Sequence, residues 1–324
     1  MCTSILYNAG DHYFGRNLDL EVSFGQEVVV TPRNYQFNFR QVPSMGHHYA
    51  IIGMALVKDN YPLYFDGANE EGLGMAGLNF DGPAHYFPLE EGKDNVSPFE
   101  FITYILGQCK NVAEARVILK KLNLVNINFS DQLQLSPLHW LIADRSGKSI
   151  VVESTFTGLH VYDNPVNVLT NNPEFPGQLT NLANYQGIAP TTPPNQLAPG
   201  VNLAVYSRGL GSHMLPGGMD SASRFVKEVF TLHHAPTGKN ELENVTNYFH
   251  CLHAVEQQGL DEVAPGKFET TIYSDGINLS TGTFYYTTYQ NNQINAVQLH
   301  HADLNCQELA LFPLQTEQVL HFQN

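Results

Sequence analysis

The sequence of 324 residues predicts an α+β protein whose sheets are mostly antiparallel. Segments typical of strands come in runs along the chain, and pairs of helical segments interrupt these runs instead of alternating with single strands. No segment repeats along the chain, and 43% of the residues are hydrophobic, which is enough for a sizeable core. We therefore expect a single domain over residues 1–324, with helix pairs covering the outer faces of the sheets.

The first quarter of the chain is mostly strand. Asn8-Ala9-Gly10-Asp11 is typical of a hairpin turn, and such a hairpin would return Gly15–Asp19 to a position beside the N-terminus. The expected strands, which are rich in β-branched residues or alternate in polarity, are Cys2–Tyr7, His12–Asn17, Gln26–Thr31, His48–Leu56, Leu63–Phe65 and Met75–Phe80.

Two helices and then four strands are expected in the middle of the chain. Ser97-Pro98-Phe99-Glu100 predicts a helix start, because it combines a serine cap, a proline in the first turn and the glutamate of a capping box. This helix should run to about Gly107, and a second should span about Asn111–Leu122. The strands that follow are Leu138–Asp144, Ser149–Ser154, Leu159–Tyr162 and Asn167–Thr170.

A proline-rich excursion occupies residues 184–205. Its four prolines exclude a regular helix or a central strand, and its length indicates a functional or assembly segment. Beyond it the pattern predicts helices at Asp220–His233 and Glu241–Val255, and strands at Thr270–Ser274, Thr283–Thr288 and Ile294–Gln298.

Composition excludes several classes of function. Lys and Arg number 16 against 31 Asp and Glu, and a net charge of −15 argues against binding to nucleic acid or to anionic membranes. No basic residue leads an apolar run at the N-terminus, and no apolar stretch approaches about 18 residues, so we expect neither secretion nor a membrane span. The four cysteines lie far apart, which fits the reducing cytoplasm and indicates neither a zinc site nor a disulfide framework.

Two motifs look functional but stand in the wrong context. Gly72-Leu73-Gly74-Met75-Ala76-Gly77 matches the dinucleotide-binding pattern, yet a strand and a turn follow it where a helix is needed. We expect these glycines to permit close packing. Adjacent histidines such as His47-His48 point to opposite faces of a strand, so we expect no metal site.

Cys2 directly follows the first methionine. If Met1 is removed, this residue carries both a thiol nucleophile and a free α-amine, whose ordinary pKa of about 7.7–8.0 suits a base. The predicted hairpin could return Arg16 and Asp19 to it, where a guanidinium would favour the thiolate and a carboxylate would orient the amine. The alternative is an ordinary surface ion pair worth less than about 1 kcal/mol. The chemistry of these residues leaves both interpretations open.

Several segments resemble the choloylglycine hydrolase family of N-terminal-nucleophile amidases, in particular its bile salt hydrolases. They follow the family order over essentially the whole chain, and they are Met1-Cys2-Thr3, His12–Asp19, Thr31–Tyr35, Gly74–Phe80, Asn95–Glu100, Asn164-Pro165, Leu169–Pro173 and Ser221–Phe225. The resemblance implies a four-layer αββα sandwich, hydrolysis of the amide that joins a bile acid to glycine or taurine, and no metal or cofactor. It also implies a homotetramer in which residues 184–205 reach a neighbouring subunit.

The resemblance also implies roles for individual residues. Cys2 would be the nucleophile once Met1 is lost, held by Arg16 and Asp19 and supported by Arg224. Asn171 and Asn79 would form the oxyanion hole, and Asn79 favours bile salts because penicillin V acylases of the family tend to carry Tyr there. The steroid would need an apolar pocket, for which the candidates are Leu20, Phe24, Tyr61, Phe129 and Leu135.

Two other functions remain open from the sequence. A penicillin V acylase or another N-acyl amidase would keep the same catalytic residues and differ only in the pocket. A non-catalytic ligand-binding protein of the same fold is the second, and persistence of Met1, which leaves no free amine on Cys2, would favour it.

Overall fold

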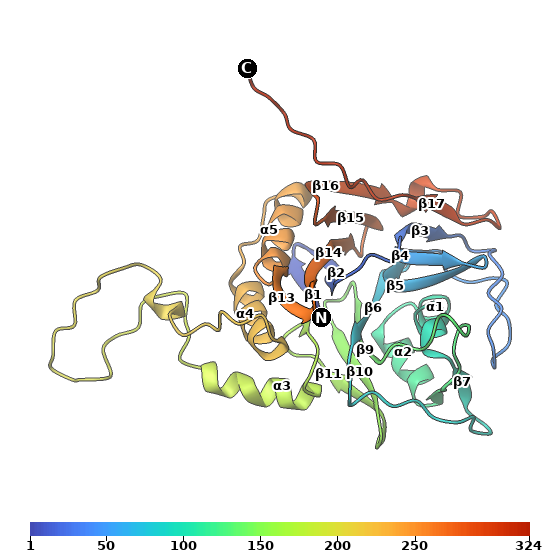
Figure 1. Ribbon diagram of the computed structural model, residues 1–324, viewed down its shortest axis with the longest axis horizontal. Coiled ribbons are helices and arrows are strands. Elements are labelled where there is room, and N and C mark those ends of the chain that lie inside the picture. The colour runs from blue at the N-terminus through green and yellow to red at the C-terminus, as the bar shows by residue number, and fades with distance from the viewer.

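The computed structural model describes residues 1–324 and contains two large antiparallel sheets packed face to face (Figure 1). Sheet A consists, in spatial order, of β12 (Val168–Leu169), β1 (Cys2–Ala9), β2 (Asp11–Leu20), β14 (Lys267–Asn278), β15 (Thr283–Thr288) and β16 (Asn291–Gln298), with β13 (Gln258–Ala264) also paired to β14. Sheet B consists of β11 (Gly158–Asp163), β10 (Ser149–Thr155), β9 (Leu138–Asp144), β6 (Leu73–Asn79), β5 (Tyr61–Asn69), β4 (Ile51–Lys58), β3 (Glu27–Thr31) and β17 (Ala310–Phe312). A separate parallel pair joins β7 (Asp94–Val96) to β8 (Leu122–Leu124).

Helices cover the outer face of each sheet (Figure 1). On sheet B, α1 (Phe101–Leu106) contacts β5 and β6, and α2 (Val112–Leu119) contacts β9. On sheet A, α4 (Ser221–His234) contacts β1 and β12, and α5 (Glu241–His253) contacts β2 and β14. The remaining helix, α3 (Phe175–Leu182), packs against α4. The predicted α+β class and four-layer αββα sandwich are confirmed. None of the helices has the length and apolar character needed to cross a membrane.

The two sheets approach closely at Gly74, in the glycine motif. A Cβ atom on Gly74 of β6 would lie 2.5 Å from the ring of Phe14 on β2, so only glycine fits between the sheets there. Gly72, with φ of +81°, makes the turn into β6. No helix follows the motif, and the prediction that these glycines serve packing is confirmed.

The N-terminal hairpin has the predicted form. Gly10 adopts φ of +70° between β1 and β2, and the strands pair with Cys2 opposite Leu18. The strands predicted at Leu138–Asp144 and Thr283–Thr288 have those same bounds in the structure.

Other predicted elements differ in their ends. The strand expected from His48 begins at Ile51, because His48 lies in a loop with its ring between the backbone carbonyl oxygens of Tyr35 and Tyr49. The second helix ends at Leu119, and Leu122 instead belongs to β8. Neither α3 nor β13 was predicted, since α3 has only eight residues with a proline in its first turn.

The proline-rich excursion extends away from the sandwich (Figure 1). After a short 3₁₀ turn at Ala183–Tyr185, it contains neither helix nor strand up to residue 205, as its prolines predicted. Most of its side chains are exposed, including Leu197 at 91%.

Glu228 of α4 is a buried carboxyl group without a partner. Its side chain is fully buried, and neither carboxyl oxygen has a hydrogen bond. Burial raises its pKa well above the ordinary value of 4.5, and the nearby Lys227 opposes this only in part. The folded protein therefore keeps a proton that the unfolded chain releases as pH rises above about 4.5, and stability falls with pH in that range.

Replacing Glu228 with methionine is expected to stabilise the protein, and to do so more at pH 7 than at pH 5. The difference arises because the free energy of unfolding of the wild type falls by about 1.4 kcal/mol per pH unit between the unfolded and folded pKa values of Glu228, and the variant lacks this fall. Urea unfolding at the two pH values measures it, with Glu317→Met, at an exposed acid near the C-terminus, as the control. An equal gain at both pH values would show that Glu228 is ionised in the folded protein.

Candidate active site

The β1–β2 hairpin brings Cys2, Arg16 and Asp19 together in the interior. Their exposed fractions are 2%, 1% and 0%, and no ion pair joins Arg16 to Asp19. They therefore do not form the surface ion pair considered from the sequence. Cys2 and Arg16 both line a cavity between the sheets.

Arg16 presents a charged guanidinium to this cavity. Its backbone N–H donates to Asp275 Oδ1 at 2.8 Å, and its Nη1 donates to the carbonyl oxygen of Gly77. Burial works against its charge, but its anionic and polar neighbours raise its pKa overall, with Cys2 first among them, followed by Tyr273, Asp66 and Asp275. Nη2 has no partner in the protein and remains a free donor. Arg16 thus places a positive charge and a free donor at the cavity wall that carries Cys2.

One carboxylate oxygen of Asp19 has no hydrogen-bond partner. Its Oδ1 accepts a hydrogen bond from Thr271 Oγ1 at 2.6 Å, whereas its Oδ2 has no hydrogen bond and lies 3.9 Å from Arg224 Nη1. Burial raises the pKa of Asp19, against the opposing effects of Arg224 and Thr271. Oδ2 is thus an unused acceptor inside the site.

Arg224 of α4 ties the helix to the start of β1. Its Nη1 donates to Cys2 O at 2.7 Å and to Thr3 Oγ1 at 2.6 Å, and its Nη2 donates to Asn171 Oδ1 at 2.8 Å. Burial lowers its pKa, while Asp19 and Cys2 oppose this. One guanidinium therefore fixes the nucleophile's strand and a residue of a distant loop.

Asn171 follows β12 and contacts both Cys2 and Asn79. Its Oδ1 accepts from Cys2 N at 2.8 Å, and its Nδ2 donates to Asn79 O at 2.7 Å. An amide nitrogen carries two hydrogens, and the second has no acceptor in the protein. Asn79, at the end of β6, lines the cavity, and Asn171 is not part of the lining but contacts two residues that are, Cys2 and Asn79.

In the sequence that includes Met1, the α-ammonium group belongs to Met1 and not to Cys2. This α-ammonium donates to Asp19 O at 2.7 Å and pairs with Glu269. Burial lowers the pKa of this ammonium, while Cys2 and Asp19 raise it and Arg224 and Arg16 lower it further. With Met1 attached, Cys2 N is an amide and cannot act as a base.

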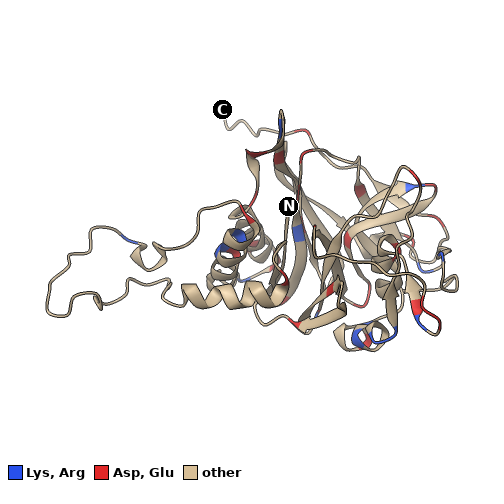
Figure 2. Ribbon diagram, turned by 60° about the horizontal axis from the view of Figure 1, so that its bottom comes forward, with Lys and Arg blue, Asp and Glu red and all other residues tan.

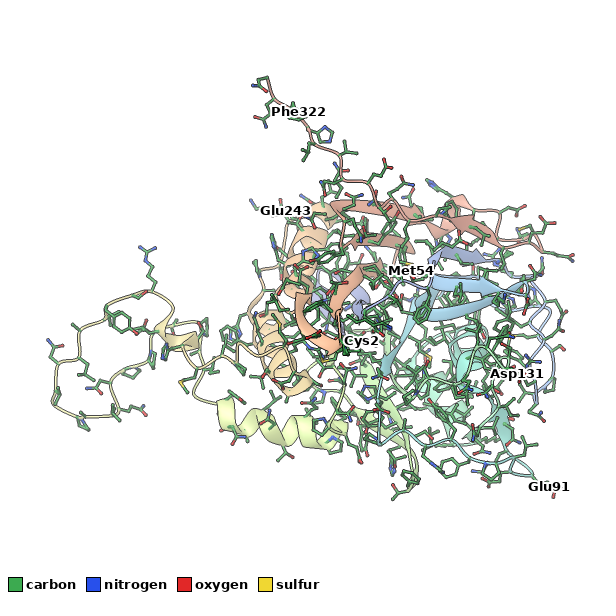
Figure 3. The ribbon with its side chains drawn as sticks, in the orientation of Figure 1. Cys2, Met54, Glu91, Asp131, Glu243 and Phe322 are labelled. Atoms are coloured by element: carbon green, nitrogen blue, oxygen red, sulfur yellow. The ribbon has the colours of Figure 1, made fainter.

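The cavity beside Cys2 is mainly apolar. Of its 21 lining residues 15 are hydrophobic, and they come from both sheets, α1 and the loops at residues 24 and 129–136. Figure 3 labels Cys2 near the centre of the molecule and Asp131 of the second loop to its right. Four of the predicted pocket residues line this cavity, namely Leu20, Phe24, Phe129 and Leu135.

Tyr61, the fifth predicted pocket residue, is not part of the cavity lining. Its ring packs behind those of Phe99 and Phe129, with centroids 6.1 Å from each, and its hydroxyl lies 3.0 Å from Thr103 Oγ1. It supports the cavity wall from the core side. Sequence reasoning missed Thr271 and Asp275, because they lie on β14 and no local pattern shows that β14 pairs with β2.

No group of three or more His, Cys, Asp or Glu side chains is arranged to hold a metal ion.

Comparisons with known proteins agree with this geometry. Residues 2–312 match the model of a family described as linear amide C–N hydrolases, choloylglycine hydrolase family. The chain is 50% identical over 318 residues to the bile salt hydrolase/transferase of Lactiplantibacillus plantarum, covering 98% of each protein. It is 36% identical over 317 residues to the bile salt hydrolase/transferase of Clostridium perfringens, covering 96% of each.

Solved structures share the whole fold. A mutant of the conjugated bile acid hydrolase from Clostridium perfringens matches with a TM-score of 0.92 and 34% identity over all of both chains. A penicillin V acylase from Agrobacterium tumefaciens matches with a TM-score of 0.75 and 19% identity over 99% of this chain and 100% of the other, which shows a common fold.

Proposed function

Because the chain belongs to the choloylglycine hydrolase family of linear amide C–N hydrolases, we propose that it hydrolyses the amide between a bile acid and glycine or taurine. The observation that carries the proposal is the position of Cys2, which lies on the wall of an apolar cavity beside Arg16. A steroid needs such an apolar cavity, and the relatives' names point to bile salts.

The proposed reaction begins with loss of Met1. The amine that this frees on Cys2 keeps Asn171 Oδ1 as an acceptor. The amine takes the thiol proton, and the thiolate attacks the substrate carbonyl carbon. The second hydrogen on Asn171 Nδ2, together with Asn79, stabilises the oxyanion, where loss of one donor typically costs about 10²–10³ in rate.

The tetrahedral intermediate then collapses. Its C–N bond breaks, and the Cys2 ammonium returns its proton to the departing glycine or taurine nitrogen. Water, deprotonated by the same amine, attacks the thioester carbonyl and releases the bile acid and the Cys2 thiol. The Cys2 amine accepts and returns the proton in each of these steps.

Rates on glycocholate, taurocholate and penicillin V, measured side by side, test the proposal. We expect kcat/KM to be higher for at least one of the two conjugates than for penicillin V, because the cavity is apolar and the family resemblance associates Asn79 with bile salts. A preference for penicillin V would favour the acylase alternative. No turnover of any amide by protein that lacks Met1 would favour the ligand-binding alternative.

We also propose acyl transfer to amines, because two relatives are named hydrolase/transferase. The same thioester reacts with a deprotonated amino group in place of water, forming a new amide. A product with a different amino acid, detected by mass spectrometry when that amino acid is in excess, tests this activity.

The proline-rich excursion supports the proposal of a homotetramer built from single-domain subunits. Residues 184–205 contain no Asp, Glu, Lys or Arg and expose several apolar side chains, among them Leu197 at 91% and Val205 at 63% (Figure 2). An uncharged apolar arm of this kind fits contact with another subunit. Light scattering gives the oligomeric state directly.

The four free cysteines support a cytoplasmic location.

A further inference from the structure

A histidine and a glutamate are buried together behind the site. His139 of β9 and Glu153 of β10 lie opposite each other in sheet B, and the side chains of both are fully buried. The ring of His139 has two hydrogen-bond partners: Nδ1 lies 3.1 Å from Glu153 Oε1, and Nε2 lies 2.9 Å from the carbonyl oxygen of Thr170. Neither residue contacts the cavity.

We propose that His139 and Glu153 form an imidazolium–carboxylate pair that positions Asn79 and Asn171 for the proposed amide hydrolysis. Neutral imidazole donates from only one nitrogen. A carbonyl oxygen cannot donate, so Nε2 must carry the hydrogen that faces Thr170 O. Nδ1 then faces a carboxyl oxygen, and the proton between them lies either on the ring or on Glu153.

The surroundings of Glu153 favour the proton on the ring. Glu153 Oε1 also accepts a hydrogen bond from the backbone N–H of Phe175, at 3.0 Å. Phe175 is the first residue of α3. The N-terminal end of a helix stabilises negative charge, and hydrogen bonding to a carboxylate favours its ionised form. Glu153 Oε2 has no hydrogen bond, and His139 is the only basic side chain paired with this carboxyl group.

The pair reaches the neighbours of both asparagines. Thr170, which accepts from Nε2, directly precedes Asn171 in the chain. Phe80, which directly follows Asn79, stacks on the His139 ring with centroids 4.2 Å apart and planes 5° apart. The His139 ring therefore holds the end of β6, which carries Asn79, beside the end of β12, which precedes Asn171. Glu153 holds the segment after Asn171 at its far end, through the backbone N–H of Phe175.

His48 provides a matched control. It is also buried, at 5% exposed, and both of its ring nitrogens lie against carbonyl oxygens, those of Tyr49 at 2.7 Å and Tyr35 at 2.9 Å. It lies in a loop before β4, and it neither lines the cavity nor bonds a residue of the site. His48→Gln therefore reproduces the loss of a buried histidine with polar contacts at both ring nitrogens, without disturbing the asparagines.

His139→Gln is expected to lower kcat for glycocholate by about 10- to 100-fold, the usual cost of displacing a catalytic group by a fraction of an ångström to 1 Å. KM should stay within about twofold, because the pair does not touch the cavity. His48→Gln should keep wild-type kcat although it too loses stability. A wild-type kcat for His139→Gln, or an equal loss for His48→Gln, would show that the pair is only structural. Should His139→Gln fail to fold, Glu153→Gln is the second variant, with the same expectation.

Nitrogen NMR of the wild-type protein with ¹⁵N-labelled histidine rings tests the pair independently of activity. The His139 signals are those that disappear in His139→Gln. They should show both ring nitrogens protonated at pH 7. One unprotonated nitrogen would overturn the proposal. If the wild type hydrolyses no bile-acid conjugate, the proposed function fails alone, and the positioning role is then measured with whichever amide the enzyme does cleave.

Discussion

Cys2→Ala is expected to abolish hydrolysis and to leave the fold intact. Cys2 contributes the only thiol in the cavity lining, so no other side chain can form the thioester. Loss of a catalytic nucleophile typically lowers kcat by about 10⁴-fold or more. Alanine keeps the small size of the residue at the start of β1, so urea unfolding should show a change of only about 1 kcal/mol.

Cys251→Ala is the matched control for this variant. Cys251 is 1% exposed and lies in the same core cluster as Cys2, but it is absent from the cavity, and burial raises its pKa to about 12. We expect near wild-type kcat from it, with a comparable loss of stability. Substantial turnover by Cys2→Ala would refute the nucleophile assignment.

Arg224→Met is expected to lower both activity and stability. Arg224 is the only ion-pair partner of Asp19, and both side chains are fully buried. Removing one member of a buried pair leaves the other uncompensated, which typically costs about 3–5 kcal/mol. The same change frees Cys2 O and Asn171 Oδ1 from their shared donor, so kcat should fall by at least about 10²-fold.

Arg116→Met is the control for charge removal. Arg116 pairs with Asp163, whose side chain is 92% exposed, and such pairs contribute less than about 1 kcal/mol. Arg224→Lys separates charge from geometry: it keeps the cation but lacks the planar fork that reaches Cys2 and Asn171 together. Full activity in Arg224→Lys would mean that only the charge of Arg224 matters.

The sequence predicted those parts of the site that depend on local structure. A four-residue turn and two strands of matching pattern suffice to return Arg16 and Asp19 to Cys2, because a hairpin is a short-range structure. The glycine motif was interpreted correctly for the same reason, since the strand that follows it is visible in its neighbours.

The remaining parts depend on contacts between distant segments. Asn171 and Arg224 reach Cys2 from separations of 169 and 222 residues, and only the resemblance to a family identified them. His139 looks like any strand histidine until β10 and the Asn171 loop close around it. Tyr61 was misplaced because an aromatic residue at a strand end can face either the cavity or the core, and Phe99 and Phe129 decide the outcome.

The most direct test of the account is the mass of the N-terminal peptide before and during turnover. Before reaction, the peptide should begin at Cys2 and carry no Met1. After a brief reaction with glycocholate and an acid quench, part of it should be heavier by one cholyl group, held as a thioester on Cys2 and released by hydroxylamine. An active enzyme that retains Met1, or a cholyl group on any other residue, would contradict the account.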